Sequence, residues 1–258
     1  MKSGKILVWD LDSTLIDTNA VFERAQKNLL SKLSAELAPL NVNVDLKNPR
    51  EFDILRAIDY EGIKIRGHPS YDNAYQLPLS LMNFYMERGE NSAEYRSAWL
   101  ANKGMDIASK LGDSYLADLK KIPEKFKGIE EVLELSKDNY NLLFTEYFED
   151  KDAQYAKIKE NGLEKYFDKI IFVEKKDTIA IASAVEYAVL ENGLDKSKPF
   201  PLVFIDDRSK YLEKEKELYP FCRTVRALFN GREIFRERSD KVDYTARDIG
   251  ELKNAEKI

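Results

Sequence analysis

Two aspartates and a threonine follow a short apolar run near the amino terminus, at intervals of two residues. The apolar run is residues 6–9, and Asp10, Asp12 and Thr14 come directly after it. Two carboxylates this close repel each other unless a cation or a proton lies between them. The spacing therefore predicts cation binding or proton transfer where the run ends.

Three further groups of polar residues each follow an apolar run later in the chain. They are Thr145 after residues 140–144, Lys175 and Lys176 after 170–173, and Asp206 and Asp207 after 202–205. If these runs are strands of one parallel sheet, their carboxyl ends share an edge, where open α/β folds bind ligands. Carboxylates can hold Mg²⁺ there, while a hydroxyl and an ammonium can hold phosphate oxygens. This combination is suited to phosphoryl transfer to an aspartate.

In such a reaction Asp10 would be the nucleophile and would form an aspartyl-phosphate. A metal and a lysine would have to neutralise the phosphoryl oxygens before the carboxylate could approach. Asp12, two residues on, could protonate the leaving alcohol and later take a proton from the attacking water. The first of these steps needs a protonated Asp12, and hence a pKa above the ordinary aspartate value of about 3.9.

The hydrophobic pattern predicts a sheet that could bring these segments together. Four consecutive apolar residues at 6–9, without polar alternation, indicate a strand buried on both faces. From residue 127 onward strand-like and helix-like segments alternate, with a last strand expected at 223–228, and this favours a parallel sheet. We therefore expect an α/β, Rossmann-like core of residues 1–17 and 122–258, with helices on both faces of the sheet.

The intervening residues 18–121 show helical periodicity and no convincing strand. Apolar residues recur at helical spacing from Phe22 to Leu37. Pro78 is placed to open another helix, and Ser92 can cap a third. We expect this insertion to form an all-helical domain that begins only a few residues after the two aspartates.

The composition limits the function classes. The chain has 258 residues, 43% of them hydrophobic, which can support a core domain and a smaller accessory one. With 41 basic and 46 acidic residues and a net charge of −5, binding to nucleic acid is not indicated. The single cysteine, Cys222, excludes an internal disulfide and fits a reducing cytoplasm. We expect neither a signal peptide nor a membrane span, because the apolar runs are too short.

The chain resembles the haloacid dehalogenase-like (HAD) superfamily, in its branch of phosphatases with an aspartate nucleophile. Four motifs carry the resemblance in the family's order: D-L-D-S-T at 10–14, L-L-F-T at 142–145, E-K-K-D at 174–177 and F-I-D-D at 204–207. The resemblance implies that Asp10 is the nucleophile and Asp12 the general acid and base. The helical insertion is similar to the family's cap, which closes over the site and reads the substrate.

The resemblance also implies which residues bind phosphate and metal. The phosphate would contact Thr14, Thr145 and one of Lys175 and Lys176, with Lys175 favoured because it follows the strand more closely. Mg²⁺ would be held by Asp10, by the backbone carbonyl of Asp12 and by the Asp206-Asp207 pair, with Asp207 on the metal and Asp206 behind it. Glu146, beside Thr145, is unusual at its position and could repel an anionic substrate or only face solvent. His68, the only histidine, is expected to be a loop residue rather than a catalyst.

The resulting hypothesis is a cytoplasmic, Mg²⁺-dependent phosphatase that hydrolyses a small phosphorylated metabolite through an aspartyl-phosphate. A phosphomutase on the same fold would share these residues, and a catalytically silent phosphate-binding or regulatory protein would keep the pocket, so both stay open. The expected partner is the phosphorylated substrate, with no nucleic acid and no membrane. The oligomeric state cannot be read from the sequence.

Overall fold

A computed structural model describes residues 4–66, 73–89, 92–147, 150–195, 197–229 and 239–255. The chain divides into two compact units. Met1–Asn19 and Ile122–Ile258 make up the first unit, and Ala20–Lys121 the second. His68 lies outside the described residues.

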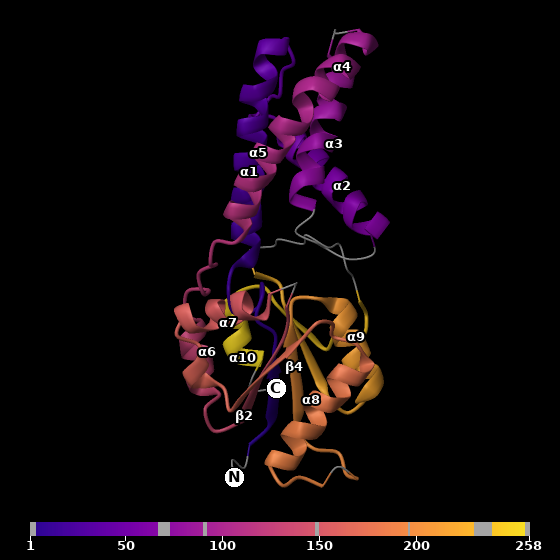
Figure 1. The fold of residues 1–258 in the computed structure, drawn as a ribbon. Helices are drawn as coiled ribbons and strands as arrows, with labels where there is room; N and C mark the ends of the chain where they lie inside the picture. Colours follow the sequence, from indigo (N-terminus) through magenta and orange to yellow (C-terminus); the bar gives the residue numbers. More distant parts are fainter. Residues whose placement is uncertain are drawn as a thin grey trace. The chain divides into compact units, whose positions relative to one another are not determined.

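In the described residues the first unit contains a six-stranded parallel sheet (Figure 1). Its strands are β1 (Ile6–Trp9), β2 (Tyr140–Glu146), β3 (Lys169–Val173), β4 (Leu202–Asp206), β5 (Arg223–Ala227) and β6 (Tyr244–Ala246), in the order β3-β2-β1-β4-β5-β6. β1 pairs with β2 on one side and β4 on the other, with Val8 opposite Leu142 and Phe204. All four residues of β1 are buried, because the unbroken apolar run can be covered on both faces.

Helices cover both faces of this sheet (Figure 1). One face packs against α6 (Ile129–Leu135), α7 (Lys151–Glu160) and α10 (Ile249–Ala255), and the other against α8 (Thr178–Glu191) and α9 (Ser209–Leu218). Successive side chains of a strand point to opposite faces, so Leu7 and Trp9 enter one core while Ile6 and Val8 enter the other. The predicted α/β, Rossmann-like core is confirmed.

Two of these helices begin close to the carboxyl ends of the strands that precede them. Asp150 caps α7 by accepting hydrogen bonds from the backbone N–H groups of Asp152 and Ala153, at 2.9 and 3.0 Å. Asp177 caps α8 by accepting from the N–H of Ala180 at 2.9 Å. Such caps satisfy N–H groups that a helix leaves unpaired at its start. They hold the first turns of α7 and α8 beside the edge of the sheet where the candidate site lies.

The second unit is helical in its described residues. After α1 (Thr18–Leu37), which starts in the first unit, its elements are η1 (Ala38–Leu40), α2 (Pro49–Arg66), α3 (Asn73–Arg88), α4 (Ala93–Trp99), the π-helical η2 (Leu100–Gly104) and α5 (Met105–Leu119). They bury an apolar core of their own, with Leu33 and Leu81 fully enclosed. A Cβ on Gly112 of α5 would lie 2.9 Å from the carbonyl oxygen of Ala74 in α3, so glycine permits this close contact. None of the described helices has the length and apolar content that a membrane crossing requires.

The structure differs from the sequence predictions at two elements. α3 begins at Asn73, so Pro78 lies inside the helix rather than at its start. The residues before the proline include Ala74 and Leu77, which are buried in the core of the second unit, and their burial favours the longer helix. β6, in a tail that reads as polar, escaped prediction because a three-residue edge strand is too short to show a pattern.

The burial of β2 between β3 and β1 leads to a stability prediction. Leu142 is fully buried, and Leu142→Ala should lower the free energy of unfolding by about 2–5 kcal/mol, because it removes apolar contacts and leaves a cavity. Leu190, at the end of α8, is 65% exposed, and Leu190→Ala should change stability by no more than about 0.5 kcal/mol. Urea unfolding followed by circular dichroism measures both. Equal losses of stability in the two variants would contradict the burial of Leu142 inside the sheet.

Candidate active site

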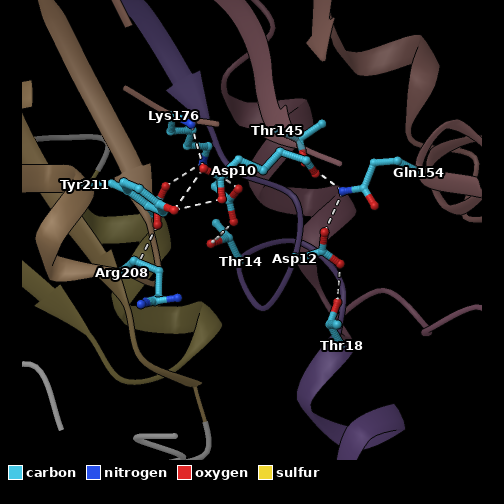
Figure 2. A network of polar contacts seen from close by, with 11 residues as sticks. Asp10, Asp12, Thr14, Thr18, Thr145, Gln154, Lys176, Arg208 and Tyr211 are labelled. Atoms are coloured by element: carbon cyan, nitrogen blue, oxygen red, sulfur yellow. Dashed lines mark hydrogen bonds and ion pairs between the residues drawn. The ribbon is translucent and has the colours of Figure 1, made fainter. Parts of the chain in front are cut away.

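Polar residues from four separate segments lie at the carboxyl ends of neighbouring strands (Figure 2). Asp10 directly follows β1, and its backbone N–H still donates to the carbonyl of Ile205 in β4, at 2.8 Å. Thr145 belongs to the end of β2, and Asp206 is the last residue of β4. Lys176 lies three residues beyond β3. The parallel sheet therefore brings to one edge residues that are almost two hundred positions apart.

Lys176 is the centre of this group. Its Nζ donates to Asp10 Oδ1 and to Asp206 Oδ2, each at 2.6 Å, and the side chain is 2% exposed. Burial alone would lower the pKa of Lys176, but Asp10 and Asp206 outweigh this and hold it well above its ordinary value. Lys176 is therefore a buried ammonium shared between two buried carboxylates.

The preference for Lys175 as the phosphate-binding lysine is corrected by this geometry. Lys175 is exposed, as is Glu174 before it. β3 ends at Val173, and the loop turns inward only at Lys176, whose backbone N–H donates to Glu146 Oε1 at 2.6 Å. Closeness to the strand in sequence was a poor guide because the loop geometry decides which side chain points inward.

Three carboxylates gather around this lysine. One carboxylate oxygen from each of Asp10, Asp206 and Asp207 lies within 4.8 Å of the other two. Burial raises the pKa of Asp10 to about 7 against the attraction of Lys176, with repulsion from Asp206 adding to the rise. Burial and the charge of Asp206 likewise raise the pKa of Asp207 well above its usual range. If all are ionised, three negative charges and one positive charge leave a balance of −2, which a divalent cation would neutralise.

This group fits the oxygen ligands that Mg²⁺ prefers. Asp206 and Asp207 each place one carboxylate oxygen in the group. Asp206 could therefore bind an ion directly, and not only support Asp207 as a ligand. Asp206 Oδ1 also accepts from the backbone N–H of Arg208 at 2.8 Å, which orients the carboxylate. Among the described residues, the side chain of Asp12 is not part of the group, and the expected contribution of Asp12 is its backbone carbonyl.

The loop after β1 folds back on Asp10. Ser13 has a φ of 64°, in the left-handed region that is uncommon for residues other than glycine. This turn lets Thr14 Oγ1 donate to Asp10 Oδ2 at 3.1 Å. Thr14 was expected to contact a substrate phosphate, but its side chain is fully buried and its hydroxyl is bonded to Asp10. In this structure Thr14 therefore orients the candidate nucleophile.

Asp12 points away from Asp10, toward α1 and α7 (Figure 2). Its Oδ1 accepts from Thr18 Oγ1 at 2.6 Å and from Lys157 Nζ at 2.9 Å, and its Oδ2 accepts from Gln154 Nε2 at 2.5 Å. Burial raises the pKa of Asp12, but the charge of Lys157 and the hydrogen bonds from Gln154 and Thr18 outweigh it, so the pKa is below its ordinary value. The expected raised pKa is therefore not found, because α7 supplies partners that stabilise the carboxylate.

Thr145 is linked to Asp12 through α7. Gln154 Nε2 donates to Thr145 Oγ1 at 2.8 Å as well as to Asp12, so one amide joins the end of β2 to the loop after β1 (Figure 2). Thr145 Oγ1 also donates to the carbonyl of Glu146 at 3.3 Å. The side chain is fully buried. Thr145 thus lies beside the carboxylates, with its hydroxyl held by neighbouring protein groups.

Sequence reasoning missed four residues of this network. Thr18, Gln154 and Lys157 contact Asp12, and Tyr211 donates its hydroxyl to Glu146. Gln154 and Lys157 are three residues apart, which places them on one face of a helix. Because α7 starts just beyond β2, that spacing was a signal that could have been used. Tyr211 on α9 gave no comparable signal, since a lone tyrosine in a helix is usually a packing residue.

Comparisons with known proteins show the fold. The sequence matches no protein-family model and no curated protein. Among solved structures, a candidate β-phosphoglucomutase from Thermotoga maritima is similar with a TM-score of 0.59 and 14% identity, over 99% of this chain and 100% of that one. The magnesium-bound candidate HAD hydrolase YfnB from Bacillus subtilis has a TM-score of 0.57 and 14% identity, over 98% and 99%. A candidate phosphatase from Clostridium difficile has a TM-score of 0.52 and 15% identity, over 99% of each chain. The chain therefore has the fold of HAD-like hydrolases, and identities this low establish the fold alone.

The burial of Lys176 predicts that the two neighbouring lysines differ sharply in their effect on stability. Lys176→Met leaves Asp10 and Asp206 buried without their partner and should cost about 3–5 kcal/mol of unfolding free energy. Lys175→Met changes an exposed side chain and should cost no more than about 0.5 kcal/mol. Urea unfolding at pH 7 in the presence of EDTA measures both variants. Similar small effects would show that Lys176 does not pair with these carboxylates.

The contacts of Asp12 predict a dependence on pH. In metal-free protein the carboxyl group of Asp12 should titrate below its ordinary value, and Lys157→Met should raise that pKa because it removes the opposite charge. Because the pKa of Asp12 is lower in the folded than in the unfolded protein, its ionised form stabilises the fold at any pH above the unfolded-state pKa. This stabilisation is lost as the pH falls through the folded-state pKa. NMR titration of the Asp12 carboxyl carbon measures the shift, with the exposed Lys159→Met on the same helix as the control. An unchanged pKa in Lys157→Met would contradict the ion pair.

Proposed function

We propose that this chain is a cytoplasmic, Mg²⁺-dependent phosphatase of the HAD-like superfamily that hydrolyses a small phosphorylated metabolite. The observation that carries the proposal is the buried Lys176 ammonium, 2.6 Å from both Asp10 and Asp206, with Asp207 completing a three-carboxylate group. A lysine and a cation beside one aspartate are what an anionic nucleophile needs to approach a phosphate. The shared fold with HAD hydrolases and the order of the four motifs support the same function.

The three carboxylates Asp10, Asp206 and Asp207 would hold the ion, together with the backbone carbonyl of Asp12. When bound, Mg²⁺ would supply positive charge that stabilises the phosphoryl oxygens. Lys176, in the loop after β3, would supply a second positive charge. The magnesium bound to the Bacillus subtilis structure of the same fold supports the choice of metal.

Asp10 begins the reaction as a carboxylate oriented by Thr14 and Lys176. Its oxygen forms a bond to phosphorus while the bond from phosphorus to the substrate oxygen breaks. The departing oxygen takes the bonding electrons and receives a proton from Asp12. The products of this half-reaction are the aspartyl-phosphate on Asp10, the released alcohol and an ionised Asp12.

In the second half-reaction water attacks the phosphorus of the aspartyl-phosphate. Asp12 takes a proton from that water, and the bond between phosphorus and the Asp10 oxygen breaks. Inorganic phosphate leaves, and Asp10 is again a carboxylate. Asp12 ends the cycle protonated and ready for the next substrate.

The observed contacts of Asp12 place a requirement on this cycle. The ionised form is stabilised by Thr18, Gln154 and Lys157, whereas the first half-reaction needs the protonated form near the leaving oxygen. Asp12 must therefore give up at least the ion pair with Lys157 before the substrate reacts. The contacts from α7 thus describe a resting arrangement of the general acid.

The helical unit of residues 20–121 is proposed as the cap that selects the substrate. It is inserted at a point where the chain enters and leaves along neighbouring segments, since the Asp17 N–H donates to the Glu124 carbonyl at 2.8 Å and the Phe126 N–H to the Leu15 carbonyl at 3.0 Å. A domain inserted through two adjacent segments can vary while the residues around Asp10 stay in place. The substrate would then be a small molecule that the core holds by its phosphate.

A phosphomutase is the second candidate, because a candidate β-phosphoglucomutase shares the fold over the full chain. Both reactions use the aspartyl-phosphate on Asp10, and they differ in whether water or a substrate hydroxyl accepts the phosphoryl group. Incubation with sugar phosphates distinguishes them. Release of inorganic phosphate identifies the phosphatase, and an isomeric sugar phosphate without phosphate release identifies the mutase.

Replacement of the nucleophile tests the proposal directly. Wild-type protein with Mg²⁺ should hydrolyse p-nitrophenyl phosphate, EDTA should stop the reaction, and added Mg²⁺ should restore it. Asp10→Asn should lose essentially all turnover, because an amide cannot form the aspartyl-phosphate. Asp195→Asn is the matched control and should be fully active, because it changes an exposed aspartate in the loop between α8 and β4. Substantial activity in Asp10→Asn would exclude Asp10 as the nucleophile.

A further inference from the structure

Glu146 is held in an unusual way for a residue next to the candidate phosphate site. Its Oε1 accepts from the backbone N–H of Lys176 at 2.6 Å and from the hydroxyl of Tyr211 at 2.9 Å. Its Oε2 accepts from the same hydroxyl at 2.8 Å. The carboxylate therefore does not face only solvent, and its position is fixed by these hydrogen bonds. It joins the end of β2 to the loop after β3 and to α9.

The alternation of side chains along β2 explains how neighbouring residues reach different partners. Thr145 and Glu146 point to opposite faces of the sheet. Thr145 meets Gln154 of α7 on one face, and Glu146 meets Tyr211 of α9 on the other. Both sides of the site are thus anchored to the last two residues of one central strand.

The backbone contact matters because of where it occurs. Lys176 is the residue whose ammonium lies between Asp10 and Asp206, and the N–H that Glu146 binds belongs to the same residue. The ammonium also lies 5.6 Å from the ring centre of Phe144 and 5.4 Å from that of Tyr211. Tyr211 therefore contacts both the Glu146 carboxylate, which accepts from the Lys176 backbone, and the Lys176 ammonium.

On its other side the loop is anchored by Asp177, which caps α8. Glu174, Lys175 and Asp177 are exposed around Lys176. A buried ammonium between two carboxylates is favourable only in good geometry, since the cost of removing it from water must be offset. A displacement of the loop by about an ångström can reduce the rate of a reaction about 10²-fold. The position of the Lys176 backbone is therefore a sensitive point in the site.

We infer that Glu146 is a positioning residue that, with Tyr211, holds Lys176 where its ammonium can act on Asp10 and on a phosphoryl group. The catalytic consequence rests on the proposed phosphatase function, whereas the structural part does not. Glu146 touches no reacting atom and acts through the backbone of Lys176. Tyr211 orients the carboxylate through its hydroxyl and covers the ammonium with its ring.

Three variants isolate this role. Glu146→Ala removes the acceptor of the Lys176 N–H, and Glu146→Gln keeps an oxygen in its place. Glu174→Ala is the matched control, because Glu174 belongs to the same loop and carries the same charge. It is exposed, and its carboxylate accepts from the hydroxyl of Tyr147 at 3.2 Å rather than contacting Lys176.

The first measurement is hydrogen exchange at the Lys176 amide, which needs no catalytic activity. In Glu146→Ala this amide should exchange at least about tenfold faster than in wild type, because its hydrogen bond is lost. Glu146→Gln and Glu174→Ala should retain the wild-type protection. Equal protection in Glu146→Ala and wild type would overturn the inference, whether or not the protein is a phosphatase.

The second measurement is the turnover of p-nitrophenyl phosphate with Mg²⁺. The kcat of Glu146→Ala should fall about 10²-fold, with recovery close to wild type in Glu146→Gln and no loss in Glu174→Ala. Wild-type kcat in Glu146→Ala, in a preparation where Asp10→Asn is inactive, would overturn the positioning role while leaving the proposed function intact. Absence of any turnover that depends on Asp10 would instead refute the proposed function, and the amide exchange would still decide the structural part.

A further variant covers the case in which Glu146→Ala does not fold. Tyr211→Phe keeps the ring over the ammonium and removes only the hydroxyl that orients Glu146. It should accelerate exchange at the Lys176 amide and lower kcat in the same direction as Glu146→Ala, by a smaller factor. Unchanged exchange and unchanged kcat in a folded Tyr211→Phe would contradict the role assigned to Tyr211 and Glu146.

Discussion

The rest of the candidate site depends on one buried ammonium between two buried carboxylates. Lys176 is 2% exposed and lies 2.6 Å from both Asp10 and Asp206. Removing three charges from water is costly, and the cost is offset only when the charges are held close together by rigid surroundings. The neighbouring strands β1 and β4 provide that rigidity for the carboxylates. The loop after β3 must provide it for the lysine, and this explains why its backbone is tied to Glu146.

The alternation of β2 divides the support of the site between two helices. Thr145 and Gln154 connect the strand to α7 and to Asp12, whereas Glu146 and Tyr211 connect it to α9 and to Lys176. The general acid candidate and the lysine therefore belong to different networks, on opposite faces of the sheet. A change in one network can alter Asp12 without moving Lys176.

Neighbouring charges also explain why the pKa values of the aspartates in the site are shifted in opposite directions. Asp10 is buried and Asp207 half-buried beside like charges, and the pKa values of both are raised. Asp12 is half-buried, and Lys157, Gln154 and Thr18 bind its carboxylate, so its pKa is lowered. Two aspartates separated by one residue thus have opposite tendencies because their partners come from different helices. The raised pKa values of Asp10 and Asp207 favour a bound cation, whereas the lowered pKa of Asp12 favours its ionised form.

Local patterns in the sequence are enough to predict the α/β core, the positions of β1 to β5 and the polar residues that follow β1 to β4. Unbroken apolar runs that stop at polar residues are local features, and the parallel sheet then forces their ends to one edge. That Lys176 rather than Lys175 turns inward, and that α7 stabilises an ionised Asp12, became visible only in the folded chain. The contacts of Glu146 with the Lys176 backbone N–H and with the Tyr211 hydroxyl likewise appear only in the folded chain. These outcomes depend on loop geometry and on contacts between segments far apart in the chain, which hydrophobic periodicity does not encode.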